Sequence, residues 1–196
     1  MSEFRAVRGD HVAWDDVAAV FGKTGYPAHC WCQRFKLDWH GLNNGPDEVL
    51  EDMLRDQCTP GDGVPPPGLL GYRDDEPVGW VAVEPRAAAR TLTAQRLDLK
   101  RRGEDRSDPE IWAVTCFVVR VGHRRTRLCY DLLGAAVEHA RASGARALEG
   151  YPMITAPGEE ITWGETHVGT RSMFIALGFD EVGHPTKRRV VMRMDL

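Results

Sequence analysis

The chain has 196 residues, 42% of them hydrophobic and 28% charged, and its formal net charge is −4. This composition predicts a single globular domain over residues 1–196, and the negative charge gives no general attraction for nucleic acid. No apolar run approaches the roughly 20 residues that a spanning helix needs, and no basic stretch precedes an apolar segment near the N-terminus, so we expect a cytoplasmic protein without a membrane partner.

The first part of the chain predicts two helices and a strand pair. Trp14–Phe21 carries apolar residues at a three-to-four spacing, and residues 46–58 begin with proline and acidic residues, as helices often do. After a loop rich in Gly and Pro, residues 69–72 and 78–83 predict two strands around a turn. Residues 84–108 are charged and lack a clear period, which predicts a surface excursion.

The second part alternates strands with helices. Ile111–Val119 is a continuous apolar run, typical of a strand buried on both faces, and Leu128–Ala142 is an amphipathic helix. Further elements are predicted as strands at 145–151, 179–182 and 189–194 and as a helix at 166–177. This order predicts an α/β (mixed α+β) fold with a mixed sheet and helices on both faces.

The cysteines do not indicate a disulfide framework or a metal site. They number five, an odd count, which favours reduced thiols. The spacing of His29, Cys30, Cys32 and His40 is not that of a common zinc site, so no metal is expected.

Four stretches, read in order, resemble the GNAT acetyltransferase family. They are the hairpin 69–83, the segment 117–127 with the helix after it, residues 144–152 and residues 172–182. Together they cover residues 65–195, and Cys30-Trp31-Cys32 resembles an N-terminal feature of one bacterial branch. The resemblance implies a GNAT-like, mostly antiparallel sheet. It also implies an N-acyltransferase that uses acetyl-CoA as co-substrate.

The resemblance also implies where acetyl-CoA binds. A turn before a helix offers unpaired N–H groups and a positive dipole to a pyrophosphate. The backbones of Phe117 and Val119 would pair with the pantetheine arm. The phosphates would bind at the turn and the helix start, at Arg124, Arg125, Thr126, Arg127 and Cys129. His167, at the start of the last predicted helix, would make a further contact with CoA.

The turn departs from the family pattern Arg/Gln-x-x-Gly-x-Gly/Ala. Arg124 matches its first position, but Arg127 and Cys129 stand where small residues belong. In one interpretation Arg127 contacts the phosphates as a cation. In another, the basic turn 120–127 binds an aminoacyl-tRNA or a carrier-bound donor. A third is a GNAT-like module that binds a ligand without catalysis.

The catalytic and acceptor residues are predicted less directly. The family's tyrosine acid is replaced by Phe174, which has no hydroxyl, so that role is not carried over. Tyr151, Glu149 and Glu110 are the candidates for acid–base catalysis because they lie on or beside the central strands. An aromatic segment and Tyr151 are predicted to line the pocket of a small-molecule amine: Trp31, Phe35, Trp39 and Tyr151. A homodimer is also expected.

Overall fold

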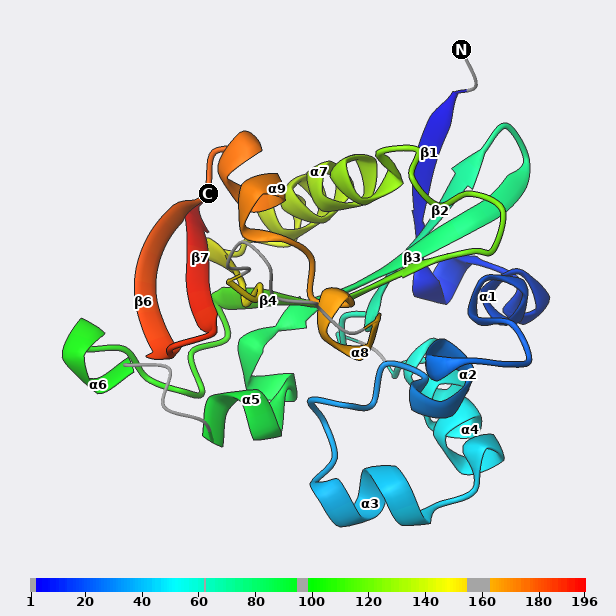
Figure 1. Ribbon diagram of the computed structural model, residues 1–196, viewed down its shortest axis with the longest axis horizontal. Coiled ribbons are helices and arrows are strands. Elements are labelled where there is room, and N and C mark those ends of the chain that lie inside the picture. Colours follow the sequence, from blue (N-terminus) through cyan, green and yellow to red (C-terminus); the bar gives the residue numbers. More distant parts are fainter. Residues whose placement is uncertain (1–2, 62, 95–98, 155–162) are drawn as a thin grey trace.

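The computed structural model describes residues 3–61, 63–94, 99–154 and 163–196. Within them the strands form one seven-stranded sheet in the order β1-β2-β3-β4-β5-β7-β6 (Figure 1). Only β4 and β5 pair in parallel, and the other neighbours are antiparallel. The strands are β1 (Phe4–Arg8), β2 (Gly68–Arg73), β3 (Glu76–Pro85), β4 (Ile111–Val119), β5 (Ala147–Gly150), β6 (Asp180–Thr186) and β7 (Arg189–Asp195). The predicted mixed, mostly antiparallel sheet is confirmed.

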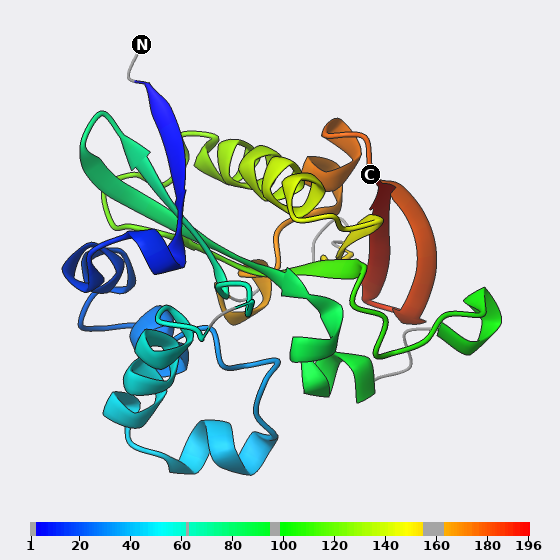
Figure 2. The ribbon, with the colours of Figure 1, turned by 180° about the vertical axis from the view of Figure 1, so that it is seen from behind.

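Helices cover both faces of this sheet. The longest, α7, lies with α9 on one face, while α1, α2 and α4 lie on the other (Figures 1 and 2). The α-helices are α1 (Trp14–Phe21), α2 (Tyr26–Cys30), α3 (Trp39–Asn44), α4 (Asp47–Gln57), α5 (Arg90–Ala94), α6 (Leu99–Arg102), α7 (Leu128–Ala142), α8 (Trp163–Thr166) and α9 (Arg171–Ala176), and the 3-10 helices are η1 (Gly9–His11) and η2 (Arg86–Ala88). No helix in the described ranges is long and apolar enough to cross a membrane.

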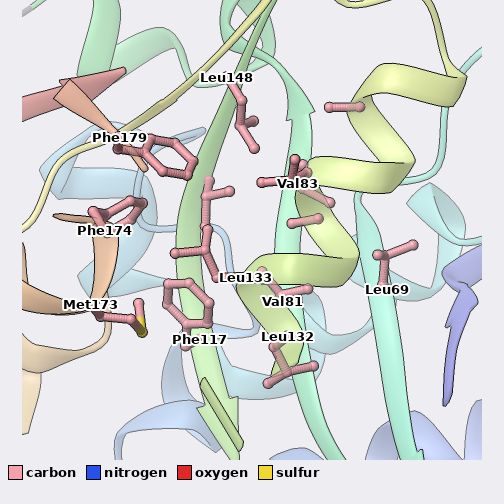
Figure 3. Packing of buried hydrophobic residues seen from close by; sticks show 14 of the residues in the cluster. Leu69, Val81, Val83, Phe117, Leu132, Leu133, Leu148, Met173, Phe174 and Phe179 are labelled. Atoms are coloured by element: carbon pink, nitrogen blue, oxygen red, sulfur yellow. The ribbon is translucent and has the colours of Figure 1, made fainter. Parts of the chain in front are cut away.

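The core beneath α7 explains why the sheet and this helix form together. Leu132 and Leu133 on the inner face of α7 meet Val81 and Val83 of β3 and Phe117 of β4 (Figure 3). Each fully buried side chain of this kind contributes about 1.5–3 kcal/mol. The apolar stripe of α7 and the apolar run of β4 therefore bury one another in one core, as their sequence patterns predicted.

The predicted helix at 166–177 is wrong in its extent, because the chain forms α8 and α9 with a break between them. Gly169 has a φ of +82°, which a helix does not allow, and Thr170 caps α9 by accepting a hydrogen bond from the Met173 N–H at 3.3 Å. A glycine followed by a capping threonine is the local signal for this break.

The excursion 84–108 is also more than a surface segment. Arg86 is fully buried, and its guanidinium contacts the carboxylates of Glu104 at 2.9 Å and Glu149 at 3.1 Å. The start and the end of the excursion are therefore fastened to the sheet by buried ion pairs.

Candidate active site

The central strands separate at a defined point. Strand β4 pairs with β5 only from Ile111 to Val114, which lies opposite Gly150. The register with β3 shifts at Thr115, because Val83 pairs with Val114 and Ala82 with Cys116. A bulge of this kind bends a strand and increases its twist. Beyond it, the edge of β4 that faced β5 is open to another partner.

Part of that open edge is already engaged by the chain itself. The Phe117 N–H donates to the carbonyl of His167 at 2.6 Å. The Phe117 amide is therefore not free for a pantetheine arm in this structure, contrary to the prediction. Val119 lies two residues after Phe117, so its backbone N–H and carbonyl point to the same side of β4. The N–H of the next residue, Arg120, points to the other side and donates to the Val78 carbonyl of β3 at 2.9 Å.

A cavity of about 490 Å³ lies between the open edge of β4, the basic turn, the start of α7 and the segment that joins α8 to α9. All eight residues predicted to bind the cofactor line it: Phe117, Val119, Arg124, Arg125, Thr126, Arg127, Cys129 and His167. Sequence reasoning missed Gly169, Thr170 and Met173 on the opposite wall. The Gly-Thr break in the predicted helix was the signal for them.

The turn keeps the backbone shape of a glycine turn despite its side chains. Arg125 and Arg127 have φ values of 63° and 61°, in the left-handed region that favours glycine. Arg127 stands immediately before α7, and its guanidinium carbon lies 4.5 Å from the centroid of the Tyr130 ring. The first N–H groups of α7 lack partners within the helix and carry its positive dipole. The cavity therefore combines a helix N-terminus with exposed cations.

The basic strip 120–127 is less extensive than the sequence indicated. Arg120 and His123 both contact the Glu76 carboxylate, at 3.1 Å and 3.4 Å. In the part of the chain that the structure describes, Arg125 and Arg127 are exposed and form no ion pair. The positive charge available to a ligand is thus concentrated at the mouth of the cavity.

The strained turn yields a stability prediction. Replacing Arg125 by Gly is expected to stabilise the fold by about 0.5–1 kcal/mol. The left-handed conformation costs a residue with a Cβ roughly 1–2 kcal/mol, and the greater backbone freedom of glycine in the unfolded chain offsets part of the strain that is relieved. Urea unfolding measures the change. The Arg125→Ala variant removes the same charge but keeps the strain, so it should not be stabilised. Equal stability of the two variants would contradict the assignment of strain.

Two predicted catalytic residues, Glu149 and Tyr151, lie inside the protein. Both side chains are fully buried, and the Tyr151 hydroxyl donates to the Glu149 carboxylate at 2.6 Å. Glu149 also accepts from Arg86 at 3.1 Å and from Arg102 at 2.7 Å. With its lone pairs occupied and no solvent access, Glu149 is a structural carboxylate, and neither residue lines the cavity.

The electrostatics of this pair agree with a structural role. Burial alone raises the pKa of the Glu149 carboxyl, but Arg102, Tyr151 and Arg86 outweigh burial and leave that pKa below its usual range. Burial and the Glu149 carboxylate raise the pKa of Tyr151 well above its usual value. Near neutral pH, therefore, Glu149 stays ionised inside its ion pairs and Tyr151 stays protonated.

The third catalytic candidate, Glu110, is at the wrong end of the strand. It is exposed, immediately before β4, and pairs with Arg146 at 3.3 Å. Phe117 lies roughly 20 Å further along, at about 3.3 Å per residue. Glu110 therefore does not reach the cavity.

The predicted acceptor aromatics also separate. Trp31 is buried in the core and stacks on Phe21 with a centroid distance of 4.8 Å, while Trp39 on α3 is 78% exposed. Neither lines the cavity. Phe35 does not line the cavity either, but its ring lies 6.0 Å from that of His167, which does. Sequence reasoning missed Tyr26, whose ring is also 6.0 Å from His167.

No protein-family model and no curated protein matches the chain. Solved structures match it over almost its full length. A ribosomal-protein-alanine N-acetyltransferase from Brucella melitensis is 16% identical, with 99% of both chains covered and a TM-score of 0.53. An acetyltransferase of the GNAT family from Streptococcus pneumoniae is 16% identical, with 99% of both chains covered and a TM-score of 0.51. The chain has the GNAT acetyltransferase fold.

A further GNAT-fold match concerns the ligand. YncA from Salmonella typhimurium, solved with acetyl-CoA as its cofactor, is 11% identical, with 98% of this chain and 93% of that chain covered and a TM-score of 0.53. Identities this low establish the fold but not the substrate. The residues that line the cavity are therefore what indicates the donor and the acceptor of this chain.

Proposed function

We propose that the chain is an N-acyltransferase that moves an acetyl group from acetyl-CoA to an amine within a ternary complex. The observation that carries this proposal is the cavity of about 490 Å³ between the open edge of β4 and the start of α7. Its volume is in the range of small-molecule sites, and it joins an apolar interior to a cationic mouth. A thioester donor with a phosphorylated end has the same polarity along its length.

Each part of the donor has a matching part of the cavity. The phosphates fit the N-terminus of α7 with Arg125 and Arg127, because N–H groups and guanidiniums both bind phosphate oxygens. The arm fits the open backbone at Val119. The acyl end then lies near Phe117 and His167, where β4 has left β5.

An aminoacyl-tRNA donor is the weaker alternative. A long polyanion needs an extended basic surface. Here Arg120 and His123 are held by Glu76, which shortens the strip to the mouth of the cavity. The compact cation pair of Arg125 and Arg127 suits the short phosphate group of a nucleotide donor better.

Transfer needs a group that accepts the proton of the amine. The amine nitrogen attacks the carbonyl carbon, the carbon–sulfur bond breaks, and CoA leaves as the thiolate or, once protonated, the thiol. We assign the proton to His167, because its imidazole lies between the cavity and the rings of Tyr26 and Phe35. Imidazole is the side chain that commonly exchanges protons near neutral pH.

Calorimetry tests the donor directly. Acetyl-CoA and CoA are expected to bind in the micromolar range, the usual scale for enzyme substrates. The double variant Arg125→Ala/Arg127→Ala should weaken binding by roughly 100-fold or more, since each of the two lost charge-assisted hydrogen bonds contributes about 1.5–3 kcal/mol, and should reduce its salt dependence.

The matched control is Arg141→Ala. Arg141 is exposed at the far end of α7 and pairs with Glu138 at 2.6 Å. The Arg141→Ala variant should leave the affinity for CoA unchanged. An absence of heat and of thermal stabilisation with both CoA and acetyl-CoA would rule out the proposed donor. Salt-sensitive binding of aminoacyl-tRNA in its place would support the alternative.

A further inference from the structure

The aromatic cluster beside the cavity carries two arginines. Tyr26 and Phe35 each place a ring 6.0 Å from the ring of His167. Arg34 donates a hydrogen bond to the Tyr26 hydroxyl, and its guanidinium carbon lies 5.7 Å from the centroid of that ring. The guanidinium carbon of Arg189 lies 5.9 Å from the centroid of Phe35. Two arginines that are far apart in the sequence therefore each contact an aromatic ring that lies beside His167.

Backbone contacts hold both arginines in place. Thr91 donates its N–H to the Phe35 carbonyl at 3.0 Å and its hydroxyl to the Arg34 carbonyl at 3.4 Å. Arg189, at the start of β7, donates to the carbonyl of Tyr151 at 3.2 Å. Both arginine residues are half-buried. Their position is thus fixed by the fold, unlike that of long cations on an open surface.

Neither guanidinium has a carboxylate partner within the described residues. Glu165 is close enough to attract Arg189, but its carboxylate is bonded to Arg188 at 3.1 Å. Burial and the Arg34 guanidinium lower the pKa of Arg189 from its usual value, and Glu165 offsets them only in part. Half-buried like charges cost free energy, and an anion bound between them offsets that cost.

We propose that Arg34 and Arg189 bind a carboxylate of the acceptor, so that the acceptor is an amine that also carries a carboxylate, as an amino acid does. This proposal rests on the proposed function, because it names the substrate class of that site. Planar guanidiniums form paired hydrogen bonds with carboxylates. Tyr26 and Phe35 contact the apolar body of the acceptor, and its amine reaches His167 and the acyl end of the cavity.

The test uses 3-phenylpropionate, which has the carboxylate and an apolar body, and its neutral analogue 3-phenylpropanamide. Calorimetry on the full chain, with and without CoA, is expected to show binding of the carboxylate at least about tenfold tighter than the amide. Arg34→Gln and Arg189→Gln should each weaken carboxylate binding by roughly 10- to 100-fold, the effect of losing a hydrogen bond to a charged group. Binding of the amide should change little.

The matched control is Arg188→Gln, which removes a cation from the residue beside Arg189. Arg188 already pairs with Glu165, so this variant should bind the carboxylate as the unaltered protein does. Equal binding of carboxylate and amide, no detectable binding of 3-phenylpropionate, or an effect of Arg188→Gln as large as that of Arg34→Gln would each overturn the proposal. CoA binding in the same titrations reports separately on the proposed function.

Discussion

Replacing Glu149 by Gln is expected to destabilise the protein by about 3–5 kcal/mol, because removing one partner of a buried ion pair leaves the other charge uncompensated. Arg86, which is fully buried, and Arg102, whose side chain is 12% exposed, would then share only the Glu104 carboxylate, so that one positive charge is left without a counter-charge. The glutamine carbonyl can still accept from the Tyr151 hydroxyl, but its NH2 group cannot accept a hydrogen bond where the second carboxylate oxygen stood. Chemical denaturation measures the loss, which is a large part of the 5–15 kcal/mol that ordinarily separates folded from unfolded domains.

The matched control is Glu110→Gln, which removes the same charge from an exposed pair with Arg146. Such pairs contribute about 0–1 kcal/mol, so little change is expected. Equal losses in the two variants would contradict the structural role of Glu149.

The same carboxylate predicts a pH dependence. Because the pKa of Glu149 is lowered in the folded state, its stabilising contribution is complete above the unfolded pKa of about 4.3 and is lost as the pH falls below it. The difference in unfolding free energy between the Glu149→Gln variant and the unaltered protein should therefore narrow as the pH falls toward 3, and unfolding curves between pH 3 and 7 measure it. A stability difference that stays constant over this range would contradict the assignment.

Elements whose sequence pattern and packing agree could be predicted closely. Trp14–Phe21, Ile111–Val119 and Leu128–Ala142 begin and end in the structure where their patterns placed them. The buried apolar residues of these three elements lie in the core clusters that pack on the sheet. The strand Phe4–Arg8 was not predicted, because it lies at the edge of the sheet and has no apolar alternation long enough to reveal it.

The two sides of the candidate site differ in how far the sequence could predict them. The donor side is mostly one continuous segment, 117–129, so that a turn motif and its neighbours name most of its residues. The acceptor side joins Tyr26 and Arg34 to Arg189, and no local pattern connects them. The aromatic residues Trp31 and Trp39 attracted attention by type alone, yet burial in the core and exposure on α3 respectively remove them from the site.

Glu149 shows the same limit for charged residues. Its place on a central strand indicated catalysis, since a carboxylate there is costly unless it serves a purpose. The purpose proved to be an ion pair with Arg86 and Arg102, which belong to the excursion 84–108. That partnership spans residues far apart in the chain, and only the folded structure reveals it.

His167→Asn is expected to lower kcat by roughly 100- to 10,000-fold, the usual contribution of a positioned general base. Asparagine is polar and of similar size but does not take up a proton near neutral pH. The hydrogen bond from Phe117 uses the backbone carbonyl of His167, so the wall of the cavity should persist. Steady-state kinetics with a panel of primary amines, followed by release of CoA, measures the effect.

The choice of asparagine separates two roles for this position. If the side chain only contacts CoA, as the family resemblance implied, an amide preserves that contact and both kcat and the affinity for acetyl-CoA should remain near their original values. If the imidazole accepts the proton of the amine, kcat falls while calorimetry shows unchanged binding of acetyl-CoA. His184→Asn is the control, because His184 is exposed on β6 beside Glu181, away from the residues that line the cavity. An unchanged kcat in His167→Asn would return His167 to the donor side and leave the proton to another group.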